Sequence, residues 1–247
     1  MHIRRLATAG ATAGLAAVLL AGCGGDSGST EESSGESSPS AAETSSEPGL
    51  ADQTGAEVSA AAADALEEAG SVHVVGSTGV GAEVSSIDLL MQGDDVSGSV
   101  EVGGQALGLL RTGGVFYMQA PADYWTASGV PAELAAELDG AWVVLPEEAA
   151  ASFAELSLAT LVEELRAPTA GVEDEVTTDE FEGEPVVVVT RTDDSTLAVA
   201  AEGEPYPLQV VSTGDQSETL TFSEHGEQFD IAAPEAPIDP SQLGAGG

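Results

Sequence analysis

The chain has 247 residues, with 43 acidic side chains against five basic ones, and a formal net charge of −38 at pH 7. All five basic residues are arginines, so a basic surface for nucleic acid is excluded, and we expect the acidic excess to form solvated faces. The lack of lysine excludes a phosphate-binding Gly-Lys loop, a Schiff-base lysine and the Ser-x-x-Lys motif of penicillin-recognising enzymes.

Residues 1–22 are predicted to be a signal peptide. Arg4 and Arg5 precede an uncharged apolar run at 6–20, which is shorter than the ~20 residues that a membrane-spanning helix needs. The following Leu20-Ala21-Gly22-Cys23 resembles the lipobox of bacterial lipoproteins. That resemblance implies that Cys23, the single cysteine, receives diacylglycerol and becomes the mature N-terminus; the alternative is an ordinary secretory signal. We therefore expect a lipid anchor on the outer face of the cytoplasmic membrane.

Residues 23–53 are predicted to be a tether. Ser, Glu, Gly, Ala, Thr and Pro dominate this stretch, and a segment of that composition cannot bury a core. A flexible chain of this length has an r.m.s. span of ~30 Å. We expect a single folded domain at 54–240, followed by a flexible tail at 241–247.

The folded part is predicted to begin with a helix. Thr54-Gly55-Ala56-Glu57 matches a capping box, apolar and small side chains recur at helical spacing from Val58 to Ala69, and Gly70 is typical of a helix end. One narrow, alanine-rich face of this helix is apolar. We expect that face to lie close against a sheet.

Alternating polar and apolar residues predict strands on both sides of a helical middle. Five short antiparallel strands are expected within 72–119, separated by glycine-rich or acidic turns. The middle predicts helices at 131–138 and 158–165, with a brief strand between them at 141–145. Strands return at 175–180, 185–191, 196–201, 208–213 and 219–224. The order is that of an α+β protein: helix, meander, helical insert, meander.

No catalytic, cofactor or metal site is predicted. After the predicted cleavage two histidines remain, His73 and His225, and we interpret both as solvent-facing structural residues because no ligand set accompanies them. The paired acids Asp94-Asp95 and Asp193-Asp194 fall between strands, where aspartate favours tight turns. We therefore expect a protein that is not an enzyme.

Three segments in this order of elements carry a family resemblance. They are Gly140-Ala141-Trp142-Val143, Glu204-Pro205-Tyr206-Pro207-Leu208 and Phe229-Asp230-Ile231-Ala232-Ala233-Pro234. With the lipobox, they make the chain resemble the LolA-like lipoproteins of actinobacteria, of the LppX and LprG type. The resemblance implies a strongly curved antiparallel sheet, a half barrel, with helices covering its concave side. It also implies an apolar cavity for a lipid or glycolipid, and exchange of that lipid with the membrane or with an envelope lipid exporter.

Within that resemblance, apolar residues of the strands and the middle helices become a hypothetical cavity lining. They are Ile87, Leu89, Met91, Phe116, Met118, Trp142, Leu161 and Leu165. A competing hypothesis is a tethered envelope interaction or assembly module with a filled core, which predicts an exposed apolar patch at Tyr124, Trp125 and Val130. A third is a hydrolase, for which the sequence offers no nucleophile and base.

Overall fold

The computed structural model describes residues 49–80, 83–153, 156–213 and 217–240. The predicted signal peptide, Cys23, most of the predicted tether and the tail at 241–247 lie outside these residues. A short 3₁₀ helix, η1 (Leu50–Asp52), precedes the first α-helix, and Leu50 packs partly buried against the core. Part of the predicted tether, Leu50–Asp52, is thus helical and contacts the large core.

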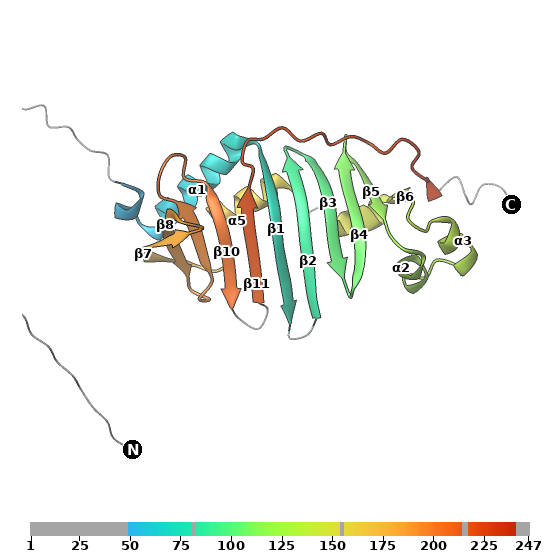
Figure 1. Ribbon diagram of the computed structural model, residues 1–247, viewed down its shortest axis with the longest axis horizontal. Coiled ribbons are helices and arrows are strands. Elements are labelled where there is room, and N and C mark those ends of the chain that lie inside the picture. The colour runs from blue at the N-terminus through green and yellow to red at the C-terminus, as the bar shows by residue number, and fades with distance from the viewer. Residues whose placement is uncertain (1–48, 81–82, 154–155, 214–216, 241–247) are drawn as a thin grey trace, which may run out of the picture. The chain divides into compact units, whose positions relative to one another are not determined.

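Eleven antiparallel strands form one curved, unclosed sheet, in the order β6-β5-β4-β3-β2-β1-β11-β10-β9-β8-β7 (Figure 1). The strands of the first meander and of the insert are β1 (Ser71–Val80), β2 (Glu83–Gln92), β3 (Asp95–Val102), β4 (Gln105–Thr112), β5 (Val115–Gln119) and β6 (Trp142–Val144). Those of the second meander are β7 (Val172–Phe181), β8 (Glu184–Arg191), β9 (Thr196–Ala200), β10 (Pro207–Thr213) and β11 (Ser217–Ser223). The two meanders meet where β1 pairs with β11. The predicted α+β fold with a curved sheet is confirmed.

The helices are few and mostly short. They are α1 (Gly55–Ala69), α2 (Ala122–Ala127), α3 (Ala132–Glu137), α4 (Glu147–Ala150) and α5 (Leu158–Arg166), with the 3₁₀ turn η2 (Ala151–Phe153) after α4. In Figure 1, α1 and α5 lie behind the sheet, across its concave face, while α2 and α3 lie beyond β5 at one end. Among the described residues, no helix is long and apolar enough to cross a membrane.

Helix α1 forms where the sequence predicts it, with both expected end signals. Thr54 N donates to Glu57 Oε2 at 2.9 Å, and Glu57 N donates back to Thr54 Oγ1 at 3.4 Å. Gly70 ends the helix with a φ of 70°, a conformation that glycine adopts without a steric cost. The buried face is narrow and alanine-rich, so α1 lies close to the sheet.

Two hydrophobic cores fill the space on the concave face. The large core lies under α1 and α5 and comprises Val58, Ala62, Ala63, Leu66, Val72, Val74, Leu89, Met91, Val96, Leu158, Val162, Leu165, Val187, Val189, Leu197, Val199, Val210 and Phe222. The small core lies between β4–β6 and the short helices and comprises Leu107, Leu109, Met118, Ala120, Trp125, Ala135, Leu138, Val143 and Leu145. Val100 and Leu156 are partly buried and pack against both cores.

A C-terminal strap, residues 224–240, runs from β11 along one end of the sheet to β6 (Figure 1). Ser71 Oγ donates to Glu227 O at 2.6 Å, and Phe229 N donates to the Gln92 side chain at 2.8 Å. At its far end, Ile238 N donates to Trp142 O at 2.7 Å. The strap thus fastens the ends of β1, β2 and β6 to one another.

Candidate functional site

The strand register arranges the concave face in three rows that run across the sheet. The first row is Val72, Met91, Val96, Arg111 and Phe116. The second is Phe222, Val74, Leu89, Gly98, Leu109, Met118 and Val143. The third is Leu220, Gly76, Ile87, Val100 and Leu107. With the exception of Arg111, these side chains are apolar or absent, so the face is suited to apolar contacts.

The rows differ in how completely they are covered. In the second row, Leu89 has no solvent-accessible surface and Phe222 is 2% exposed. In the third row, Leu220, Ile87 and Val100 are only partly buried. Gly76 lies between Leu220 and Ile87, where an added Cβ would come within 2.7 Å of Leu220 Cδ2, so the glycine leaves room for the Leu220 side chain. Leu107, the remaining side chain of this row, is 2% exposed, so the third row is an apolar strip at the margin of the covered area only from Leu220 to Val100.

Seven of the eight predicted lining residues lie between the sheet and its helices. Ile87, Leu89, Met91, Phe116 and Met118 belong to the rows, and Leu161 and Leu165 pack against the large core from α5. Trp142 is the exception. Its neighbour Val143 pairs with Met118 in the small core, whereas Trp142 pairs with Gln119 and points to the convex face.

Side chains fill the space between α1, α5 and the sheet. Leu66 and Leu197 have no accessible surface, and Leu165 on α5 is 1% exposed. Surfaces buried to this degree leave no room beside them for a water molecule, so the large core is close-packed. A ligand between α5 and the sheet would have to displace some of these contacts.

The edge of this interface opens into a groove, here called the α5 groove, of about 570 Å³. Leu158, Ala159 and Val162 provide its apolar floor, and its remaining lining residues are Glu67, Gly70, Gly93, Asp94, Glu163 and Arg166. That volume lies within the range of ~300–1,000 Å³ typical of ligand pockets. An apolar floor under a charged rim suits an amphiphile.

Arg166 fastens the rim of the α5 groove to α1. Its Nη2 donates to Asp64 Oδ1 at 2.6 Å and to Glu67 Oε2 at 2.7 Å, and these bonds raise the pKa of Arg166 above its usual range. Both carboxylates are exposed, so the pairing is a weak restraint rather than a source of stability. Two carboxylates of α1 thus hold Arg166 of α5 at the point where the groove opens.

A second groove, of about 420 Å³, lies on the convex face over β3–β6. Trp142 forms part of it beside Gly108, where an added Cβ would come within 3.1 Å of the indole. Gln119 Nε2 donates to Gly140 O at 2.7 Å, and Asp139 accepts from Ala122 N at 2.9 Å. The polar groups of this groove are thus already hydrogen-bonded within the chain.

The two histidines are structural but less exposed than expected. His73 is half-buried on the convex face, with Nε2 2.8 Å from Asp88 Oδ1 and Nδ1 3.5 Å from Glu224 Oε2. His225 stacks on Tyr206 at 4.5 Å, and its Nε2–H donates to Pro207 O at 3.0 Å. Burial lowers the pKa of His225. In the described part of the chain, no three or more His, Cys, Asp or Glu side chains gather as a metal site would require.

The apolar patch expected for an interaction module does not form. Trp125 is buried in the small core, and its Nε1–H donates to Ala120 O at 3.2 Å. Tyr124 packs edge-on against Trp125, with ring centroids 5.6 Å apart, and Val130 also packs against the small core. These residues close the short helices α2 and α3 onto the sheet, and Tyr124 and Val130 are only partly exposed.

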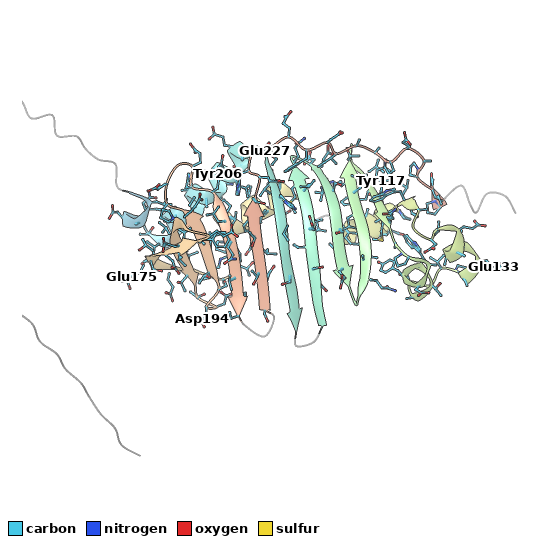
Figure 2. The ribbon with its side chains drawn as sticks, in the orientation of Figure 1. Tyr117, Glu133, Glu175, Asp194, Tyr206 and Glu227 are labelled. Atoms are coloured by element: carbon cyan, nitrogen blue, oxygen red, sulfur yellow. The ribbon has the colours of Figure 1, made fainter. Side chains whose placement is uncertain are left out.

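The acidic side chains are spread over the domain. Figure 2 shows Glu133 and Glu175 at opposite ends of the sheet, with Asp194 at the tip of a hairpin near the Glu175 end. Asp193 is held in that turn because Ser195 Oγ donates to its Oδ1 at 2.7 Å, which lowers the pKa of Asp193. The predicted role of paired aspartates in turns fits this geometry.

A scan against protein-family models and a search of the curated proteins gave no match. Among solved structures, the chain is similar to the lipoprotein LppX of Mycobacterium tuberculosis, with 15% identity, a TM-score of 0.48 and coverage of 72% of this chain and 98% of that chain. A MucA/MucB complex of Pseudomonas aeruginosa matches with 15% identity, a TM-score of 0.34 and coverage of 78% and 61%. A DUF1329 family protein of Desulfovibrio piger matches with 10% identity, a TM-score of 0.29 and coverage of 73% and 94%. Because these TM-scores are below 0.5, the function is argued from the residues of the chain itself.

Proposed function

We propose that this protein is a non-enzymatic lipoprotein that binds lipid acyl chains between α5 and the concave face of its sheet. Cys23 anchors it to the outer face of the cytoplasmic membrane, and the acidic tether lets the domain exchange lipid or glycolipid with that membrane or with an envelope lipid exporter. The observation that carries the proposal is the continuity of apolar side chains from the α5 groove to the third row.

Helix α5 is the element that would give way to a ligand. It has nine residues, and only Leu158, Val162 and Leu165 of them are buried. Helix α1 has fifteen residues, and its close-packed face includes Val58 and Leu66. An acyl chain that enters at the α5 groove replaces the contacts of α5 with equivalent apolar contacts, so its net cost is small.

The filled large core favours a second candidate, a tethered interaction or assembly module without a ligand. Its partner surface cannot be the patch at Tyr124, Trp125 and Val130, since Trp125 is buried and the other two pack against the small core. The partly exposed third row would then be the surface for a partner protein. The two candidates differ in what the purified domain carries.

Native mass spectrometry of the chain from residue 24 onward, with lipid extraction, tests the proposal. This length keeps every described residue and omits the lipidated cysteine. Expression in an actinobacterial host should give near-stoichiometric acyl lipid on the protein. A bare protein that also fails to bind a long-chain fluorescent lipid would favour the interaction module.

A pair of substitutions assigns the lipid to the α5 groove. Ala159→Trp fills the groove from an exposed position on its floor, so it should lower lipid occupancy without disturbing the core. Ala136→Trp adds the same bulk at an exposed position on α3 and should leave occupancy unchanged. Equal occupancy in both variants would exclude the groove as the entrance.

A further inference from the structure

Arg111 is a charged side chain in an otherwise apolar row. It pairs with Val96 of β3 on one side and with Phe116 of β5 on the other, and all three face the concave side. Its guanidinium carbon lies 5.1 Å from the centroid of the Phe116 ring. The ring supports the guanidinium plane through a cation–π contact but offers it no hydrogen-bond acceptor.

Arg111 differs from the other two arginines of the described chain. Arg166 bonds to two carboxylates, and Arg191 Nη1 lies 3.9 Å from Glu164 Oε1. Among the described residues, no carboxylate lies within 4.0 Å of the Arg111 guanidinium, and its buried Nε has no hydrogen-bond partner. Arg111 is thus the one arginine without a carboxylate partner in the part of the chain that the structure describes.

An unpaired donor on a charged group is costly to bury. The penalty for leaving it unsatisfied is the full desolvation of that donor, so an unsatisfied buried donor in a folded protein calls for an explanation such as a bound water, a bound ion or a functional role. The guanidinium presents its N–H groups as a planar fork that fits the oxygens of a phosphate or a carboxylate. Of the partners that could satisfy this donor, an anion is the one that the fork of N–H groups fits best.

The apolar surroundings specify which anion carrier fits. Arg111 precedes the turn at Gly113, whose N–H donates to Asp95 Oδ1 at 3.2 Å. That bond ties the β4–β5 turn to the start of β3, and the preceding turn residues Gly93 and Asp94 line the α5 groove. From Arg111 to Leu107, one face of β4 extends ~13 Å from this end of the sheet to the third row. Leu109 and Leu107 on this face are buried in the small core, so an alkyl chain attached to an anion at Arg111 would replace apolar contacts of that core along this distance.

We propose that Arg111 binds the anionic headgroup of a lipid whose chain lies over the second and third rows. This inference rests on the proposed function and adds the chemistry of the headgroup to it. The remaining acidic surface repels free anions, so the apolar chain is what brings the anion to this site. Arg111 selects anionic amphiphiles over neutral ones of the same chain length.

Isothermal titration calorimetry on the chain from residue 24 onward tests the selection with three probes below their micelle concentrations: dodecyl phosphate, dodecyl maltoside and inorganic phosphate. Arg111→Gln should lower the affinity for dodecyl phosphate roughly tenfold to a hundredfold, the loss expected for charge-assisted hydrogen bonds. The affinity for dodecyl maltoside should stay unchanged. Arg191→Gln removes the same charge from a paired arginine and should change neither affinity. Arg111→Lys keeps the charge without the fork and should give an intermediate loss; it also serves if Arg111→Gln does not fold.

Three outcomes distinguish a failure of the headgroup assignment from a failure of lipid binding itself. If wild type and Arg111→Gln bind dodecyl phosphate equally, the headgroup assignment is overturned while lipid binding stands. If inorganic phosphate binds as tightly as dodecyl phosphate, Arg111 is an anion site without a lipid. If neither amphiphile binds wild type, the proposed function is overturned and the headgroup assignment with it.

Discussion

The two hydrophobic cores share one sheet but are covered in different ways. The large core lies under the fifteen-residue α1 and the nine-residue α5, and many of its aliphatic side chains have no accessible surface. The small core is closed by two six-residue helices and centres on Trp125. Between them, Leu156 and the third row from Leu220 to Val100 are covered only in part. One sheet thus carries a close-packed large core, a small core under short helices, and an apolar strip that is covered only in part.

The largest expected effect is a difference in unfolding free energy between substitutions in the second and third rows on β2. Leu89→Ala should lower the free energy of unfolding by about 3–5 kcal/mol, because the close-packed large core cannot collapse around the cavity. Ile87→Ala, two residues away on the same face, should cost about 2 kcal/mol or less, since its side chain is already partly exposed. Urea denaturation of both variants measures the difference. Equal losses would mean that the third row is as tightly packed as the second.

A smaller effect should show whether the two halves unfold together. Leu138→Ala in the small core should cost about 2–3 kcal/mol. Both tryptophans, Trp125 and Trp142, lie in the small-core half, whereas far-UV circular dichroism reports on the whole sheet. The two signals should follow one transition, because β2–β4 and Val100 are common to both halves. A fluorescence change that precedes the loss of circular dichroism in this variant would make the halves independent units.

A pH effect should arise at His225 beside the large core. Because burial lowers its pKa in the folded state, the unfolded chain binds the proton more readily, and stability falls as the pH drops below the unfolded value of ~6.5. Urea midpoints at pH 7.5 and 5.5 should therefore differ more for wild type than for His225→Phe. Tyr206→Phe keeps the stacked ring and should retain the wild-type difference. An identical pH dependence in all three proteins would show that His225 does not cause the loss of stability at low pH.

The smallest effect on stability is expected at Arg166. Arg166→Gln removes exposed ion pairs between α5 and α1, so its urea midpoint should stay close to that of wild type. Uptake of a fluorescent lipid should nevertheless become faster, because α5 loses its ion pairs with α1 and keeps only its apolar contacts with that helix. High salt should accelerate uptake by wild type in the same direction. An unchanged uptake rate would show that α5 does not control entry.

Local signals in the sequence located most elements, but they could not place them in space. Thr54, Glu57 and Gly70 give α1 its ends, and alternating residues give each meander its strands, so these were predictable. Helix α2 escaped because six residues after Pro121 show no helical period. The pairing of β1 with β11 has no local signature at all.

The candidate site shows the same limit at particular residues. Ala141-Trp142-Val143-Val144-Leu145 is apolar on both faces, so the sequence could not tell that Trp142 points away from Met118. In the sequence, Arg111 is recognisable only as one of the few basic residues. The lack of a hydrogen-bond partner for its Nε, and its place between Val96 and Phe116, became visible only in the structure.

The meeting of β1 with β11 also constrains when the protein can fold. Ser71 and Glu227, joined by a hydrogen bond, lie 156 residues apart in the chain. Each meander can form hairpins as it is synthesised, but the centre of the sheet forms only after β11 has been made. Such distant pairing is slow, and until it occurs both β1 and β11 are open strand edges. The early polypeptide therefore needs protection from aggregation just where the finished sheet is most secure.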